Sequence, residues 1–201
     1  MLHNAFHLSI IWRELILRTL KYALLGLIDR EPITGYDIVK EFESRVMANF
    51  WYAKHSQVYP ELKKLTEEGF VEYKVILQGE KMEKKLYSIT PAGHEEFVKW
   101  MKKDEPIGVT PKDIFRLRSY FTDFISAEDY LKLLNSQLRM HTERSLTLKK
   151  TMESHNNTVP AFGTKEYGDY CVLLGAIMRE DYYISWLNEC IKNIKEQADL
   201  S

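Results

Sequence analysis

Residues 55–69 read HSQVYPELKKLTEEG, and this short stretch carries the pattern on which the predicted fold depends. Val58, Leu62 and Leu65 recur at the period of an α-helix, which predicts a short amphipathic helix with one buried face. Such a helix can belong to many helical domains, so the residues at its ends and on its outer face need separate consideration.

Residues with special backbone properties mark both ends of this predicted helix. Pro60 cannot donate a backbone N–H and is expected in or next to the first turn, which favours Ser56 or Gln57 as the N-cap, with Ser56 the better cap. Gly69 is expected to end the helix in the position after the C-cap.

The outer face of the predicted helix carries hydrogen-bonding and cationic side chains, crowded toward its start. A helix that enters the DNA major groove needs such a face, because its N-terminal residues meet the base edges. Alternatively, the segment is an ordinary surface helix. For Tyr59 the alternative to a DNA contact is a packing role under the wing, the hairpin that is described below. The side chains on this face are His55, Ser56, Gln57, Tyr59, Lys63 and Lys64.

Composition limits the classes of protein that fit. The chain has 201 residues, 45% of them apolar, and a net charge of −1, so it is long enough for one large or two small domains. Any DNA contact must then come from a local basic patch. Cys171 and Cys190 lack metal-site spacing, which favours a reduced, cytoplasmic protein. The sequence shows no motif of a cofactor site, metal site or enzyme nucleophile, so we expect none of these.

The segments around residues 55–69 extend the pattern in both directions. Residues 19–28 and 34–43 have helical periodicity, and residues 70–77 and 85–89 read as two strands joined by turn residues. A hairpin directly after a third helix is the wing of a winged helix-turn-helix. Its turn and return strand carry a lysine cluster, which can hold phosphates beside the groove or be a solvated face. The lysines are Lys81, Lys84 and Lys85.

The chain divides into regions by composition. Residues 1–18 form an N-terminal extension whose apolar run is too short and too charged to cross a membrane. It is either an extra helix that packs on the C-terminal domain or on a partner subunit, or an upstream start that adds little. Residues 19–103 are the expected DNA-binding domain, 104–111 a linker containing prolines and glycine, and 112–201 a helical domain.

The second half predicts a short helical segment followed by two long helices with apolar seams at alternating three- and four-residue steps. These seams either close on each other within one chain or pair across a two-fold axis. We assign them to dimerisation, with His141 and Ser145 as polar seam positions that fix register. The assigned residues are Leu131, Leu134, Leu138, Leu148, Leu173, Ile177, Ile184, Leu187 and Ile191. The predicted fold is mainly α with a small β-hairpin: an N-terminal winged helix-turn-helix followed by a C-terminal long-helix dimerisation domain.

Residues 19–100 resemble the PadR family of bacterial transcriptional regulators in order and spacing. The segments that carry the resemblance are Ala23–Leu27, Gly35–Ile38, Phe50–Trp51, Gln57–Leu62, Leu65 with Glu68–Gly69, and Tyr87–Gly93. The second half resembles the longer C-terminal region of one subgroup, mainly in residues 173–175 and 186–187. Residues 1–18 have no counterpart in the family pattern.

The resemblance implies a homodimer that binds a palindromic double-stranded DNA operator, usually as a repressor, and that often responds to a small aromatic or hydrophobic effector. It adds Tyr36 to the candidate DNA-binding residues. The competing hypothesis is a ligand-binding or adaptor protein that keeps the fold without binding DNA. Affinity for DNA that falls steeply as salt rises separates the two.

Overall fold

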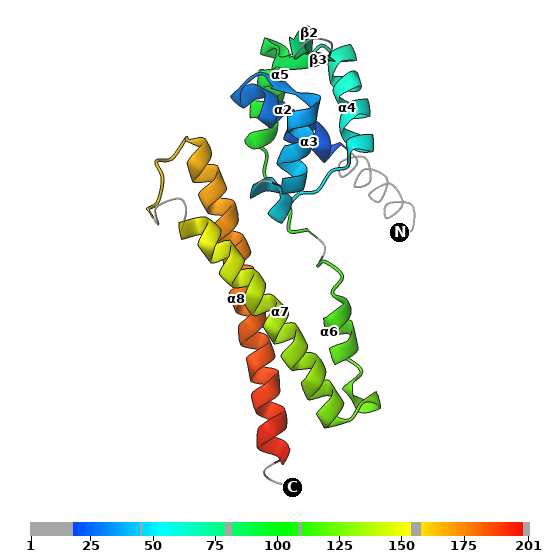
Figure 1. The fold of residues 1–201 in the computed structure, drawn as a ribbon, viewed down its shortest axis with the longest axis vertical. Helices are drawn as coiled ribbons and strands as arrows, with labels where there is room; N and C mark the ends of the chain where they lie inside the picture. Colours follow the sequence, from blue (N-terminus) through cyan, green and yellow to red (C-terminus); the bar gives the residue numbers. More distant parts are fainter. Residues whose placement is uncertain (1–17, 45, 79–81, 109, 154–157, 199–201) are drawn as a thin grey trace. The chain divides into compact units, whose positions relative to one another are not determined.

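The computed structural model describes residues 18–44, 46–78, 82–108, 110–153 and 158–198, and the chain divides into two compact units, residues 1–106 and 107–201 (Figure 1). The predictions for residues 1–17 of the N-terminal extension and for Lys81 lie outside the described residues. No helix in the described ranges is both long and apolar enough to cross a membrane.

The described residues of the first unit form helices and a small sheet in the order of a winged helix-turn-helix. The elements are α2 (Thr19–Arg30), β1 (Ile33–Thr34), α3 (Gly35–Ser44), the 3-10 helix η1 (Val46–Asn49), α4 (His55–Glu67), β2 (Val71–Gln78), β3 (Met82–Ile89) and α5 (Pro91–Met101).

The sheet has the strand order β1-β3-β2 and is antiparallel throughout. The predicted hairpin is confirmed, with Val71 opposite Ile89 and Gln78 opposite Met82. The short strand β1 was not predicted, because two residues are too few to show a period; it pairs Ile33 with Tyr87. β2 is therefore an edge strand of the sheet.

The apolar stripes of α2, α3 and α4 meet in one core against the base of the sheet. On α4, Val58, Leu62 and Leu65 are all fully buried, as the helical period predicts. They pack in one cluster with Leu24 of α2 and Phe42 of α3. Burial of each such side chain stabilises the fold by about 1.5–3 kcal/mol, which holds the outer face of α4 in a defined orientation.

The predicted start of α4 was wrong by two residues, because the expected cap was Ser56. The helix begins at His55 with Lys54 as the N-cap, and the Lys54 backbone N–H donates to the Gln57 side-chain oxygen over 3.0 Å. Gln57 is thus at the third helical position, where its side chain can reach back to the cap. Pro60 lies inside the helix, just beyond the first turn, where its missing N–H leaves one backbone carbonyl without a helical partner.

The end of α4 follows the predicted signal, and α5 starts at a threonine cap. Gly69 has a φ of 74°, the left-handed conformation that suits glycine after a helix. Thr90 caps α5 by accepting the Gly93 backbone N–H over 3.1 Å. A Cβ at Gly93 would collide with the Phe70 carbonyl oxygen, so glycine there lets α5 pack closely against the chain that enters β2.

The second unit is helical. It contains α6 (Ile114–Ser119), the 3-10 helix η2 (Thr122–Phe124), α7 (Ala127–Glu153) and α8 (Lys165–Ala198). Ser126 accepts the Asp129 backbone N–H at the start of α7. α7 and α8 lie side by side as an antiparallel pair (Figure 1). In the short segment before them Phe115 is buried, whereas Ile114, Leu117, Phe121 and Phe124 are exposed.

The two seams that we assign to dimerisation face each other within one chain, and their contact with a second copy stays a prediction. Leu134 and Leu187 are fully buried in the core of this unit. A seam predicts that a helix needs a partner but not which helix that partner is. The other assigned residues are buried (Leu148, Leu173, Ile177, Ile191) or half-buried (Leu131, Leu138, Ile184) in the single chain.

A polar layer crosses the middle of this helix pair. The His141 ring nitrogen lies 2.5 Å from a carboxylate oxygen of Glu180, which is 3% exposed, and Arg144 pairs with the same carboxylate over 3.3 Å. Ser145 donates to Asp181 over 2.7 Å. A shift of one helix along the other would separate Glu180 and Asp181 of α8 from their partners on α7, so this layer defines the register.

Candidate nucleic-acid interface

The outer face of α4 is exposed, as a groove-entering helix requires. The buried stripe of α4 leaves all six candidate side chains of this helix on the solvent side: His55, Ser56, Gln57, Tyr59, Lys63 and Lys64. The His55 and Tyr59 rings lie 4.3 Å apart, so the start of the helix presents an aromatic pair beside its polar residues.

Tyr59 occupies a position that depends on Gly35, the first residue of α3. A Cβ built on Gly35 would approach the Tyr59 ring to 2.9 Å, so a side chain there would displace the ring. Tyr59 remains 37% exposed in this position. Tyr59 therefore packs between α3 and α4 and is also partly exposed, and its contact with DNA stays a prediction.

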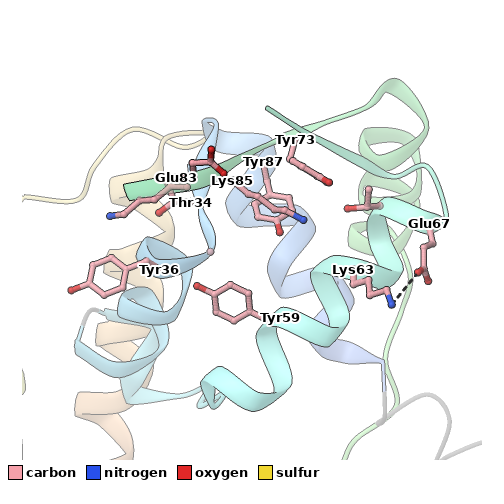
Figure 2. Close-up of a pocket in the computed structure, with 12 residues that line it drawn as sticks. Thr34, Tyr36, Tyr59, Lys63, Glu67, Tyr73, Glu83, Lys85 and Tyr87 are labelled. Carbon is pink, nitrogen blue, oxygen red and sulfur yellow. Dashed lines mark ion pairs between the residues drawn. The ribbon is translucent and has the colours of Figure 1, made fainter. Parts of the chain in front are cut away.

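A cleft of about 1000 Å³ lies between the start of α3, the outer face of α4 and the wing, which is the hairpin of β2 and β3 (Figure 2). Five of the predicted site residues meet in it: Tyr36, Tyr59, Lys63, Lys84 and Lys85. In Figure 2 the Tyr59 ring extends from α4 toward α3, the element that carries Tyr36.

Aromatic rings hold the lysines of the cleft in place. The Lys84 ammonium lies 5.0 Å from the Tyr36 ring centroid, and Lys40 lies 4.4 Å from the same ring. Lys85 lies 4.0 Å from the ring centroid of Tyr73. A cation over an aromatic face is attracted by the ring quadrupole while its N–H groups stay available, so both wing lysines can still meet an anion.

Ion pairs inside the cleft are weak. Lys63 approaches Glu67 over 3.7 Å, and both side chains are largely exposed, which makes the pair worth little in water. A phosphate group can therefore replace the carboxylate with little loss of free energy. Lysine ammonium groups and tyrosine hydroxyls together form a donor set that suits the phosphates of a nucleic-acid backbone.

Gln57 has one half of its amide already occupied. Its side-chain oxygen accepts the Lys54 N–H, so the remaining amide group is a donor that faces solvent at the start of α4. A glutamine that recognises adenine by two hydrogen bonds uses both its amide oxygen and its amide nitrogen. Because the oxygen of Gln57 is occupied by the cap, only the amide nitrogen is available as a donor. Gln57 can read a single base acceptor without giving up the cap.

Sequence reasoning missed the tyrosines of the sheet. Tyr73 and Tyr87 face each other across β2 and β3 with ring centroids 5.7 Å apart, and both line the cleft. Burial raises the pKa of Tyr87 above its ordinary value of 10.0, so it stays a neutral phenol at physiological pH. The alternation of the two strands was the signal that could have placed these rings on the α4 side of the wing.

In the part of the chain that the structure describes, no group of three or more His, Cys, Asp or Glu side chains is placed to hold a metal ion. The cleft is built from phenols, ammonium groups and two carboxylates at its rim, Glu67 and Glu83. Its chemistry is that of a binding surface for an anionic polymer.

Comparisons with known proteins agree with this geometry. A family model described as the transcriptional regulator PadR-like family matches residues 24–99, and one described as virulence activator alpha C-term matches residues 111–195. The Negative transcriptional regulator PadR of Bacillus subtilis is 39% identical over 180 residues, which cover 89% of this chain and 98% of that protein.

Two crystal structures of the Bacillus subtilis protein are similar along the chain. PadR in complex with operator DNA has a TM-score of 0.84 at 40% identity, covering 88% of this chain and 99% of that chain. PadR in complex with p-coumaric acid has a TM-score of 0.78 at 36% identity, covering 89% and 97%. The sequence match and the shared winged helix lead to one conclusion: this chain belongs to the PadR-like family of transcriptional regulators.

Proposed function

We propose that this protein is a DNA-binding transcriptional regulator, acting as a repressor, that binds a palindromic operator as a homodimer. The observation that carries this proposal is the cleft between α4 and the wing, where two helices and a sheet gather lysines and tyrosines on one face. The operator complex of the Bacillus subtilis relative, which shares 40% identity, supports it.

In this mechanism α4 enters the major groove with its first turn toward the bases. Gln57 donates to a base acceptor, Ser56 and Tyr59 reach base edges or phosphates, and His55 donates to a phosphate. Lysines on both sides of the cleft hold the backbone strand that runs between α4 and the wing. They are Lys63, Lys64, Lys84 and Lys85, with Tyr36 beneath the wing lysine.

A palindromic operator requires two copies of the chain, one on each half-site. Because the apolar seams of α7 and α8 pack against each other, we assign the contact with the second copy to the outer face of α8. Leu174, Met178 and Tyr182 recur every four residues there and are 39%, 63% and 67% exposed. Such a row of exposed apolar side chains on a helix is typical of an interaction surface.

We also propose that a small aromatic acid releases the protein from its operator, since the Bacillus subtilis relative was crystallised with p-coumaric acid. The place of action is the bacterial cytoplasm, where the chromosome is. A ligand that binds the DNA-free form more tightly than the DNA-bound form lowers operator occupancy by that difference in affinity.

Selection of bound fragments from the source genome, followed by footprinting, tests the proposal. The expected result is a palindromic footprint whose half-sites lie about one turn of DNA apart, and an affinity that drops steeply as salt rises. Recovery of random fragments without a shared sequence would contradict a sequence-specific regulator. Addition of p-coumaric acid to the complex then tests release by an effector.

A further inference from the structure

The edge strand β2 carries a row of apolar side chains that the rest of the unit does not cover. Tyr73, Val75 and Leu77 share one face of the strand because successive side chains alternate. They are 42%, 56% and 74% exposed, whereas Val71, the first residue on the same face, is 2% exposed. The row starts at the core and becomes more exposed toward the turn of the wing.

The strand register shows what lies beside this row. Tyr87, Lys85 and Glu83 stand opposite Tyr73, Val75 and Leu77 on the same face of the sheet. Tyr73, Lys85 and Tyr87 also line the cleft beside α4, so the row is continuous with the proposed DNA surface.

We propose that the row Tyr73–Val75–Leu77, here named the wing stripe, packs against the deoxyribose rings of the DNA minor groove, next to the phosphates that the wing lysines hold. The proposal rests on the proposed function and adds a second kind of contact to it. The backbone of DNA alternates charged phosphates with sugars whose C–H faces line the groove, and proteins commonly place apolar side chains there.

Two features favour DNA over another protein as the partner of the wing stripe. Lys85 lies 4.0 Å from the Tyr73 ring centroid, so the stripe has a cation at its border, as an apolar surface next to phosphates requires. The stripe is also continuous, through Tyr73, with the cleft that contains the wing lysines.

This contact differs from the lysine contacts in its dependence on salt. Lysines that neutralise phosphates release counterions, so their contribution falls as salt rises. Apolar side chains that lose water against a sugar release no counterions. The wing stripe therefore supplies affinity that remains at high salt and is the same for every sequence.

The experiment measures the affinity of the full chain for two duplexes of equal length, the selected operator and a random sequence, over a range of salt concentrations. In the test variant Val75→Thr is combined with Leu77→Thr, which keeps strand propensity and removes apolar surface. We expect affinity to fall about five- to tenfold on both duplexes with an unchanged log–log salt slope. The matched variant, Ile107→Thr with Val159→Thr, removes exposed apolar surface outside the wing and should bind as the wild type does.

Glu83 provides an independent measurement, since its exposed carboxylate stands opposite Leu77 on the stripe face. If DNA covers this face, Glu83→Gln should raise affinity several-fold on both duplexes. Unchanged affinity in this variant or in the threonine variant would overturn the inference, as would a threonine variant that changes self-association but not DNA binding. Melting curves of the variants and the wild type are the control that each variant is folded. A wild-type chain that binds neither duplex would refute the proposed function itself.

Discussion

At the scale of single residues, Gln57 has two roles that compete for one side chain. Its oxygen caps α4 through the Lys54 N–H, and its nitrogen faces the surface where a base would lie. Replacement by alanine removes the cap and the donor together. A weakened DNA complex in that variant would therefore not distinguish a missing base contact from a frayed helix.

Gln57→Glu separates the two roles, because the carboxylate still accepts the cap hydrogen bond and is favoured at a helix N-terminus. We expect the melting temperature to stay near that of the wild type, while preference for the operator over random DNA falls by about 1–3 kcal/mol. Gln57→Ala should lose about 0.5–2 kcal/mol of stability as well. Equal weakening on operator and random DNA in the glutamate variant would show that Gln57 does not read a base.

Glu96 joins α5 to α2 through a buried ion pair and predicts a dependence of stability on pH. The Lys21 ammonium, 7% exposed, donates to Glu96 over 2.9 Å, and the Tyr22 hydroxyl donates to the same oxygen over 3.0 Å. The hydrogen bond from Lys21 lowers the pKa of Glu96 below its ordinary value of 4.5, with a further contribution from Tyr22. The stability from this carboxylate is therefore present above pH 4.5 and is lost as pH falls through its lowered pKa.

Glu96→Gln should destabilise the fold by about 1–3 kcal/mol near neutral pH, because the Lys21 charge stays buried without its partner. Urea unfolding near neutral pH and well below the ordinary pKa of a glutamate measures this. The effect should shrink at the lower pH, where the wild type also loses the charge. Glu95→Gln, at the exposed neighbouring position, should change little at either pH. An effect of Glu96→Gln that does not depend on pH would contradict the ion-pair account.

At the scale of elements, the wing and α4 act together because aromatic rings position the wing lysines. Lys84 is placed by Tyr36 of α3 and Lys85 by Tyr73 of β2. Two of the predicted lysines thus have defined positions beside aromatic rings, and their contact with phosphates stays a prediction.

We expect Lys84→Ala combined with Lys85→Ala to weaken binding to every duplex and to lower the log–log salt slope by about 0.9 for each phosphate that is no longer neutralised. Lys102→Ala with Lys103→Ala removes the same charge from exposed positions at the end of α5, outside the cleft lining, and should leave the slope nearly unchanged. Titrations over a range of salt concentrations give the slope. Equal slopes for the two double variants would show that the wing lysines act only through net charge.

At the scale of the whole molecule, the two faces of α8 predict which substitutions affect assembly. Leu187 faces α7 and is fully buried, whereas Met178 lies in the exposed row with Leu174 and Tyr182. Leu187 and Met178 lie on the same helix, but in the single chain Leu187 is buried and Met178 is exposed. Substitution at Leu187 should affect folding, and substitution at Met178 should affect association.

Met178→Lys should convert the dimer to a monomer without lowering the stability of the chain, and operator affinity should fall by roughly 10² because the second half-site is no longer tethered. Leu187→Ala should instead destabilise the helical unit by about 2–5 kcal/mol. Sedimentation with thermal unfolding measures both effects. A chain truncated after Lys103 should remain folded and monomeric and should bind DNA weakly. A Met178→Lys chain that still sediments as a dimer would place the interface elsewhere.

Much of the first unit follows from signals that are local in the chain. The order of its helices and hairpin, the buried stripe of α4 and the ends marked by Gly69 and Thr90 could all be predicted from the residue pattern. Periodicity and capping depend on residues a few positions apart, so both can be recognised in the sequence. The family pattern is a set of such local segments, which is why it was also recognisable.

Contacts between distant residues needed the folded chain, because no local signal specifies them. The cleft depends on Gly35 and Tyr59, which are far apart in the chain and in contact in space. The partner of each long seam could not be predicted either, since the apolar residues of α7 fit any helix of matching period. The pairing of buried Glu180 with His141 and Arg144 of α7 favours α8 of the same chain, because a buried carboxyl group needs polar and cationic partners.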